Sequence, residues 1–179
     1  ASGIVGVDTW NSKICIDNIN ITIDSFIAKQ FVLSDVINLS NNLSYKNDKI
    51  KINSVIKHIN DSLSSSFWIN STHLNFNKGK KVFDEEKSAV AALNNLLKDN
   101  RSLIDNNVLD SFLRRILEID YELASIAIEN AVAQGGNNKS IDKAMKEIVN
   151  GNDDASKDKF TNAVNHYKNA WQSAINSIK

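Results

Sequence analysis

The sequence predicts a mainly helical protein, a bundle of about six helices with a short N-terminal β-strand or hairpin segment. The 179 residues include no proline and only six glycines, so the residues that usually interrupt helices are scarce. Apolar residues recur at helical spacing from about residue 28 to the end of the chain, whereas the first 28 residues lack this spacing and include a stretch that alternates between apolar and polar. We therefore expect two parts, an N-terminal β segment over 1–28 and a helical bundle domain over 29–179.

The alternation is strict from Ile19 to Asp24, with β-branched residues on one side and polar residues on the other. This pattern is typical of a half-buried strand. We expect a strand from about Lys13 to Asp24, and the segment Gly3–Trp10 is a candidate for a second strand. The connection between the two lacks the Asn-Gly or Asp-Gly pair that most favours a tight hairpin.

Three helices are expected in the first half of the domain. The first begins near Ala28. The second follows a short turn at residues 45–48 and runs up to Ser66. The third carries acidic residues 84–86 near its start, where the helix dipole favours them. Between the second and third helices we expect an ordered loop whose aromatic residues contact the core. The apolar stripes are Val32, Val36, Leu39 and Leu43, then Ile52, Val55, Ile56, Ile59 and Leu63, then Val82, Val90, Leu93 and Leu97.

Three more helices are expected in the second half. The fourth is the longest, from about Asp105 to Gln134, and Gly135 and the glycine after it can end it in the left-handed conformation. Ser140 can cap a short fifth helix, which we expect to stop at the Asn-Gly pair at 150–151. The sixth has a continuous stripe formed by Phe160, Val164, Tyr167, Trp171, Ala174 and Ile178.

Composition excludes several classes of function. Twenty-one basic and 21 acidic residues cancel, so the long-range field that favours nucleic-acid binding is missing, and we expect no nucleic-acid partner. The single cysteine, Cys15, excludes an intramolecular disulfide and any multi-cysteine metal site. No apolar run approaches the roughly 18 residues that a membrane span requires. We also expect no cofactor.

No motif indicates catalysis, and we expect the protein not to be an enzyme. Asp120 lies on the apolar stripe of the fourth helix, with Arg114 and Arg115 shortly before it. It is either a buried carboxylate with a perturbed pKa or, as the more common case, part of an ion pair between helices. A hydrolase that uses Asp120 with a glutamate is the least favoured alternative. No two histidines have the close spacing of metal ligands on one helix; they are His58, His73 and His166.

The chain contains seven Asn-x-Ser/Thr glycosylation acceptors, against about 3.5 expected by chance from its composition. The chain begins with Ala1, Ser2 and Gly3, the kind of small residues that follow signal-peptide cleavage and that trimming in vivo would leave as well. We therefore expect an extracellular or cell-surface protein that carries N-linked glycans, with chance occurrence as the alternative for the acceptors. The candidate asparagines are Asn20, Asn38, Asn42, Asn60, Asn70, Asn100 and Asn138.

Two stretches resemble a helical domain that recurs in secreted and cell-surface archaeal proteins and in some bacterial ones. The first includes residues 67–69, 72–74 and 81–87, and the second, over 141–148, 151–154 and 163–171, is similar to a tetratricopeptide-like helical hairpin. The resemblance covers roughly residues 31–179. It implies a helical fold and an extracellular location, and it implies no catalytic residue.

A strand must pair its backbone groups, and the helical remainder of the sequence offers no further strand. The N-terminal segment can therefore pack as a small hairpin on its own chain or add a strand to a neighbouring subunit, a contact that tends to build filaments. We expect a non-enzymatic extracellular structural protein, a self-assembling subunit of a surface filament or layer. The alternative is a monomeric binding module, in which the C-terminal hairpin and the loop around Trp68 form a groove for a peptide or glycan. The expected assembly residues are Ile14, Ile16, Ile19, Ile21 and Ile23.

Overall fold

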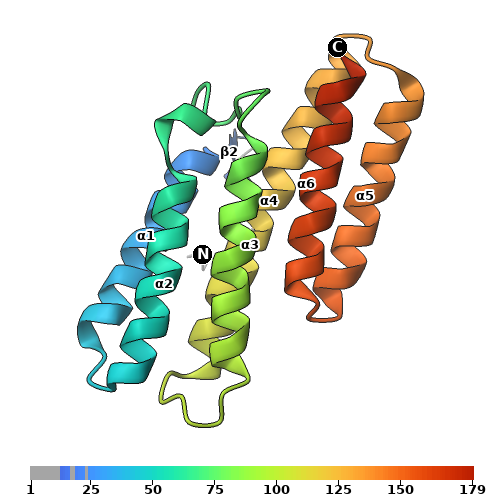
Figure 1. The fold of residues 1–179 in the computed structure, drawn as a ribbon. Helices are drawn as coiled ribbons and strands as arrows, with labels where there is room; N and C mark the ends of the chain where they lie inside the picture. The colour runs from blue at the N-terminus through green and yellow to red at the C-terminus, as the bar shows by residue number, and fades with distance from the viewer. Residues whose placement is uncertain (1–12, 17–18, 23) are drawn as a thin grey trace, which may run out of the picture.

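The computed structural model describes residues 13–16, 19–22 and 24–179. The described chain contains six α-helices (Figure 1), which confirms the predicted mainly helical class. The elements are β1 (Lys13–Ile16), β2 (Ile19–Thr22), α1 (Ser25–Asn42), α2 (Lys46–Ser62), the 3-10 helix η1 (Ser65–Phe67), α3 (Lys80–Leu97), α4 (Asn106–Ala133), α5 (Asn138–Ser156) and α6 (Phe160–Ser177).

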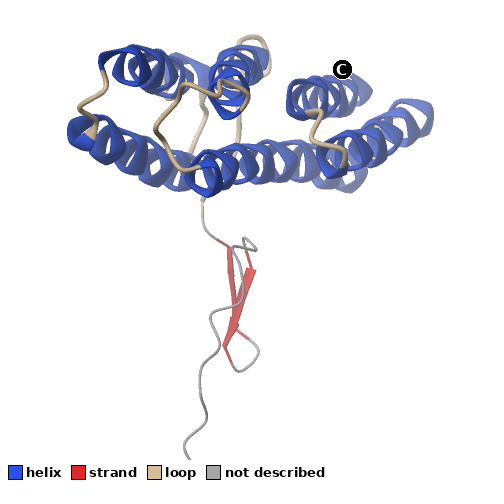
Figure 2. Ribbon diagram, turned by 90° about the horizontal axis from the view of Figure 1, so that it is seen from below, coloured by secondary structure: helices blue, strands red, loops and turns tan. Residues whose placement is uncertain are grey.

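The helices form two layers, with α2, α3 and α6 in one and α1, α4 and α5 in the other (Figure 2). Helices α1 to α4 form a four-helix bundle, because each packs against the next and α4 packs against α1. Helix α6 packs on α3, α4 and α5, so α3 and α4 belong to both halves of the molecule. One continuous apolar core results. The connections at residues 43–45, 134–137 and 157–159 are short, which favours antiparallel packing of the helices that they join.

The predicted bounds of the second and fifth helices are wrong at both ends. Helix α2 ends at Ser62 and not at Ser66. The expected turn at 45–48 is limited to its first residue, since α2 begins at Lys46 and carries Asp48 in its first turn, where the helix dipole favours an acid. Helix α5 begins after Asn137, whose side chain accepts a hydrogen bond from the backbone N–H of Ser140, so Asn137 is the capping residue. It also continues through Gly151, which lies against the ring of Tyr167 inside the helix pair.

The predicted end of α4 is confirmed. Gly135 follows the helix with a φ of +69°, a left-handed conformation that glycine adopts without strain. Helix α1 begins at Ser25, so the predicted boundary between residues 28 and 29 falls inside this helix.

The two strands pair antiparallel, with Ile14 opposite Ile21 and Ile16 opposite Ile19. They lie outside the two helical layers (Figure 2). The segment Gly3–Trp10 and residues 17, 18 and 23 lie outside the described residues, among them the candidate assembly residue Ile23. The longer strand expected from Lys13 to Asp24 therefore stays a prediction.

Candidate functional site

A surface groove lies between the loop over residues 69–76 and the C-terminal halves of α4 and α6. It encloses about 160 Å³. Its walls are mostly apolar, and polar groups from the loop and from α4 also face it. The lining residues are Ile69, Thr72, His73, Leu74, Phe76, Leu123, Ile126, Ala127, Asn130, Gln134, Trp171, Ile175 and Ile178.

Hydrogen bonds to one asparagine fold the groove loop. The side-chain Oδ1 of Asn70 accepts hydrogen bonds from the backbone N–H groups of Thr72 (3.0 Å) and His73 (2.9 Å). The backbone N–H of Ile69 donates to the carbonyl oxygen of His73 at 2.8 Å. This Asx-type turn leaves Ile69 at the groove edge, with 56% of its surface exposed.

His73 connects the loop to α4. Its Nε2 lies 2.8 Å from the Nδ2 of Asn130, and its Nδ1 lies 2.8 Å from the hydroxyl of Thr72. The groove therefore combines polar groups of His73, Asn130 and Gln134 with apolar walls, and its apolar edge includes Phe76, which is 51% exposed. Such a mixture of apolar surface and a few polar groups is typical of small binding sites.

The structure corrects the expected role of Trp68. Its side chain is buried, its Nε1 donates to the carbonyl oxygen of Ser62 at 2.9 Å, and its ring packs edge-on against Phe26. Trp68 is not among the lining residues of the groove, whereas Phe76 is. Sequence reasoning missed Phe76, because a single aromatic residue between two asparagines carries no periodic signal. The prediction that Trp171 and Tyr167 pack in the core is confirmed, since both are buried.

A second feature is an ionic cluster in the core of the four-helix bundle. It consists of Lys29 from α1, Glu86 from α3 and Asp120 from α4, whose side chains are 1%, 1% and 0% exposed. The Nζ of Lys29 donates a hydrogen bond to Oε1 of Glu86 and lies 3.7 Å from Oδ1 of Asp120. The same Nζ lies 5.9 Å from the centroid of the Trp68 ring, a favourable place for a cation.

Burial shifts the pKa values of this cluster. Desolvation raises the pKa of Asp120 to about 7, although nearby Lys29 opposes the shift. Desolvation lowers the pKa of Lys29 to about 8, against the opposing effect of Asp120. Three carboxylate oxygens of the cluster accept no hydrogen bond, namely Oε2 of Glu86 and both oxygens of Asp120. Asp120 is thus a buried member of an ion pair between α4 and α1, the more common of the two cases expected for it, and its burial accounts for the raised pKa.

The two arginines that precede Asp120 on α4 pair with other residues. Arg114 binds Asp110 (2.7 Å) and Arg115 binds Asp35 (2.7 Å), both at the surface side of α4. Lys29 pairs with Asp120 because α1 packs against α4. A sequence signal existed: Lys29 precedes the valines of the α1 stripe by three and seven positions, so it occupies a core position. Glu86 likewise occupies a core position, between Val82 and Val90 on the apolar stripe of α3.

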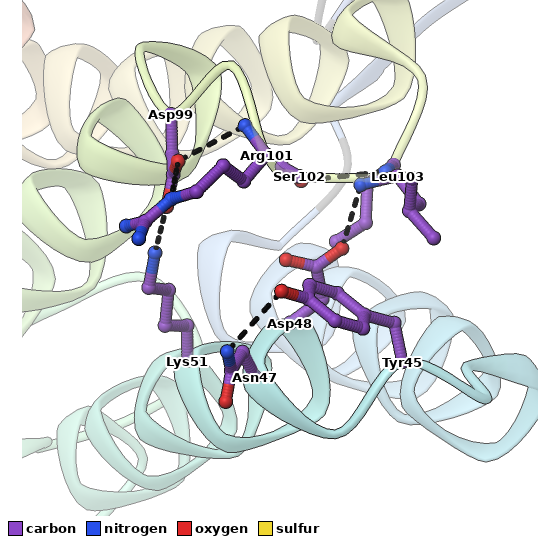
Figure 3. A network of polar contacts seen from close by, with 9 residues as sticks. Tyr45, Asn47, Asp48, Lys51, Asp99, Arg101, Ser102 and Leu103 are labelled. Carbon is purple, nitrogen blue, oxygen red and sulfur yellow. Dashed lines mark hydrogen bonds and ion pairs between the residues drawn. The ribbon is translucent and has the colours of Figure 1, made fainter.

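A polar network connects the start of α2 to the loop between α3 and α4 (Figure 3). The Oδ2 of the buried Asp48 accepts a hydrogen bond from the backbone N–H of Leu103 at 2.8 Å. Beside it, Asp99 accepts from the Nζ of Lys51 (2.6 Å) and from the Nε of Arg101 (3.0 Å). Hydrogen bonds from Arg101 and then Lys51 hold the pKa of Asp99 well below its usual range. The network fixes one end of the bundle.

Apart from Asn70, which lies in the groove loop, the other predicted site residues lie away from the groove or outside the described side chains. His58 pairs with Glu85 (2.8 Å) and His166 with Glu147 (2.6 Å). Within residues 24–179 no three histidine or acidic side chains are grouped as metal ligands would be. Cys15 lies in β1 and Asn20 in β2. The six other glycosylation candidates are all exposed: Asn38, Asn42, Asn60, Asn70, Asn100 and Asn138.

Among the described helices, none is both long enough and apolar enough to span a membrane. Searches of protein-family models, curated proteins and solved structures find no match to this chain. The function must therefore be inferred from the side chains themselves.

Proposed function

We propose that this chain is an extracellular binding module that holds an apolar side chain of a partner peptide in the groove beside Trp171. The observation that carries the proposal is the groove itself, whose edge exposes Ile69 and Phe76 over about half of their surfaces. Exposed apolar side chains around a concave site favour contact with another molecule. The volume of about 160 Å³ suits one leucine- or phenylalanine-sized side chain.

A peptide fits this chemistry better than a sugar. The walls come largely from isoleucine, leucine and phenylalanine side chains, against which sugar hydroxyls would lose hydrogen bonds to water. The side-chain amides of Asn130 and Gln134 can pair with the backbone N–H and C=O groups of an extended peptide. Trp171 is buried at the groove floor, so its ring face is not open for sugar stacking.

The test is a titration of the ¹⁵N-labelled protein with the blocked peptide acetyl-Gly-Leu-Gly-amide, followed by NMR. We expect saturable shifts in the amides of residues 69–76 and 126–134, and none with acetyl-Gly-Ser-Gly-amide. Phe76→Ala removes about 1 kcal/mol of apolar contact and is expected to weaken binding about fivefold. Val149→Ala, at an exposed apolar position on α5 outside the groove lining, is the matched control. Absence of shifts at the groove, or equal affinity in Phe76→Ala, would refute the proposal.

The extracellular location is supported by the glycosylation acceptors. All six that the structure describes with their side chains expose the asparagine to solvent, on helices and on turns. Glycans there would leave the apolar groove walls uncovered, with the exception of Asn70, which lies in the groove loop. Expression in a glycosylating host and mass spectrometry of the resulting peptides would measure the occupancy of each acceptor.

The second candidate function is self-assembly into a surface filament or layer through the N-terminal segment. It is favoured by one observation: β1 and β2 form a two-stranded sheet in which each described strand pairs along one edge. The other edge of each strand can accept a strand from a neighbouring subunit. The register places Ile14 opposite Ile21 and Ile16 opposite Ile19, within the segment expected to carry assembly.

Light scattering over a wide concentration range tests this function. The shortened chain should begin at Asp24, because Asp24 accepts a hydrogen bond from Ser71 at 2.8 Å and belongs to the helical body. We expect the full chain to grow in mass with concentration and the shortened chain to remain a monomer. A full chain that stays at 19.9 kDa throughout would refute assembly and leave the groove proposal unaffected.

A further inference from the structure

In the buried cluster the amine of Lys29 lies within contact distance of the carboxyl group of Asp120, and the carboxylate of Glu86 lies beside the same amine. The Nζ of Lys29 lies 3.7 Å from Oδ1 of Asp120, and the same nitrogen donates to Oε1 of Glu86. All three side chains are enclosed by helices α1, α3 and α4 and have almost no solvent exposure. The cluster is separate from the groove, so its chemistry is independent of the proposed function.

An ordinary buried salt bridge does not explain the composition of this cluster. One lysine faces two carboxyl groups, so the cluster is neutral only when it holds one additional proton. Both oxygens of Asp120 lack a hydrogen-bond partner, whereas a carboxylate retained for stability is normally hydrogen-bonded. The raised pKa of Asp120 assigns the extra proton to this group, and the lowered pKa of Lys29 brings the neutral amine within reach near neutral pH.

The geometry points to an intramolecular amide bond between Nζ of Lys29 and Cγ of Asp120, with Glu86 as the catalytic residue that accepts and returns the proton. Glu86 qualifies because its Oε1 contacts the reacting nitrogen directly. The bond would join α1 to α4 covalently across the core of the bundle.

The reaction is a condensation that needs no oxidant and no co-reactant. Lys29 begins as an ammonium, Asp120 as a carboxylic acid and Glu86 as a carboxylate. A proton moves from Nζ to Glu86, and the neutral amine then attacks Cγ of Asp120. The C–N bond forms, Glu86 returns its proton to the Asp120 hydroxyl, which leaves as water, and Glu86 then accepts the second proton from Nζ. The products are one amide, one water molecule and a protonated Glu86.

The core favours this step for two physical reasons. Holding the two groups in one place replaces an encounter in solution, an effect that reaches effective concentrations of about 10⁵ M or more for well-oriented groups. The apolar surroundings also favour the neutral amine and acid over the ion pair, and the neutral amide over both. Once the water has left, the buried amide is out of reach of hydrolysis.

Intact-mass spectrometry of the purified full chain tests the proposal without any substitution. We expect a mass about 18 Da below the mass of the sequence, for the loss of one water molecule. Proteolytic digestion should then yield a branched peptide that joins the segment containing Lys29 to the segment containing Asp120. A folded protein with the full mass would overturn the proposal, and so would a branch that ends at Glu86.

Three variants assign the roles. Lys29→Arg keeps the positive charge but cannot condense, and Asp120→Ala removes the acyl group, so both should retain the full mass expected from their sequences. Glu86→Gln keeps both reacting groups and removes only the proton acceptor. We expect most Glu86→Gln molecules to remain unbonded while circular dichroism shows the helical fold. Complete bond formation in that variant would overturn the role of Glu86, because a residue that only supports the fold would leave the mass unchanged.

Discussion

Substitution of Asp48 tests whether its hydrogen bond to Leu103 stabilises one end of the bundle. Its side chain is 1% exposed, and its Oδ2 accepts a hydrogen bond from the backbone N–H of Leu103 across the connection between α3 and α4 (Figure 3). Asp48→Ala removes a hydrogen bond to a charged group, which contributes about 1.5–3 kcal/mol. We use the lower end of this energy range, because Leu103 is 76% exposed and water can reach its N–H group. Loss of an acid from the first helical turn adds about 0.5 kcal/mol.

We therefore expect Asp48→Ala to lower the free energy of unfolding by about 2 kcal/mol. Urea denaturation at pH 7 measures this as a shift of the midpoint by roughly 1 M with an unchanged slope. Asp48→Asn keeps a neutral acceptor of the same size and should lose about half as much.

The matched control is Asp61→Ala on the same helix. Asp61 is partly exposed and forms an i,i+4 pair with Lys57, an interaction expected to contribute about 0.5 kcal/mol or less. If Asp48→Ala and Asp61→Ala destabilise the protein equally, the hydrogen bond to Leu103 does not close the bundle and the reasoning is refuted.

Two further predictions concern Gly151 and Asp99. A Cβ atom at Gly151 would lie 2.5 Å from Cε1 of Tyr167. We therefore expect Gly151→Ala to lower the free energy of unfolding by about 1 kcal/mol or more, despite the better helix propensity of alanine. A higher melting temperature of this variant would contradict the prediction. The pKa of Asp99 is lowered first by Arg101, so its contribution to stability is present above its usual pKa of 3.8 and is lost as pH falls through its lower folded value. A ¹³C NMR titration should place the midpoint of Asp99 below 3.8, and Arg101→Met should raise it; an unchanged midpoint would contradict the assignment.

Hydrophobic periodicity was sufficient to predict the six helices. The stripes of α4 and α6 are long and regular, and their core residues are buried as expected. Boundaries failed where a local signal competed with tertiary packing. The Asn-Gly pair at 150–151 favours a helix end, but Gly151 instead gives the Tyr167 ring room against α5, and the helix continues.

The candidate sites were predicted less completely than the helices. Asp120 was identified from its position on an apolar stripe, because a charged residue there must be buried when the stripe is buried. Its partner was not identified, since nothing in the spacing of residues within α4 indicates which helix will face it. The groove was expected between the C-terminal hairpin and the loop around Trp68, whereas its lining comes from the loop over residues 69–76, α4 and α6, with Phe76 and not Trp68 at its edge.

The sequence by itself determined the helical class, the number of helices and most of the apolar residues on their core faces, because these follow from the periodic spacing of apolar residues along one chain. It also determined the lack of net charge and the number of glycosylation acceptors. Only the tertiary structure decided that Lys29, Glu86 and Asp120 meet in one buried cluster. The physical reason is that such contacts join residues far apart in the chain, and helix packing alone sets the distances between them.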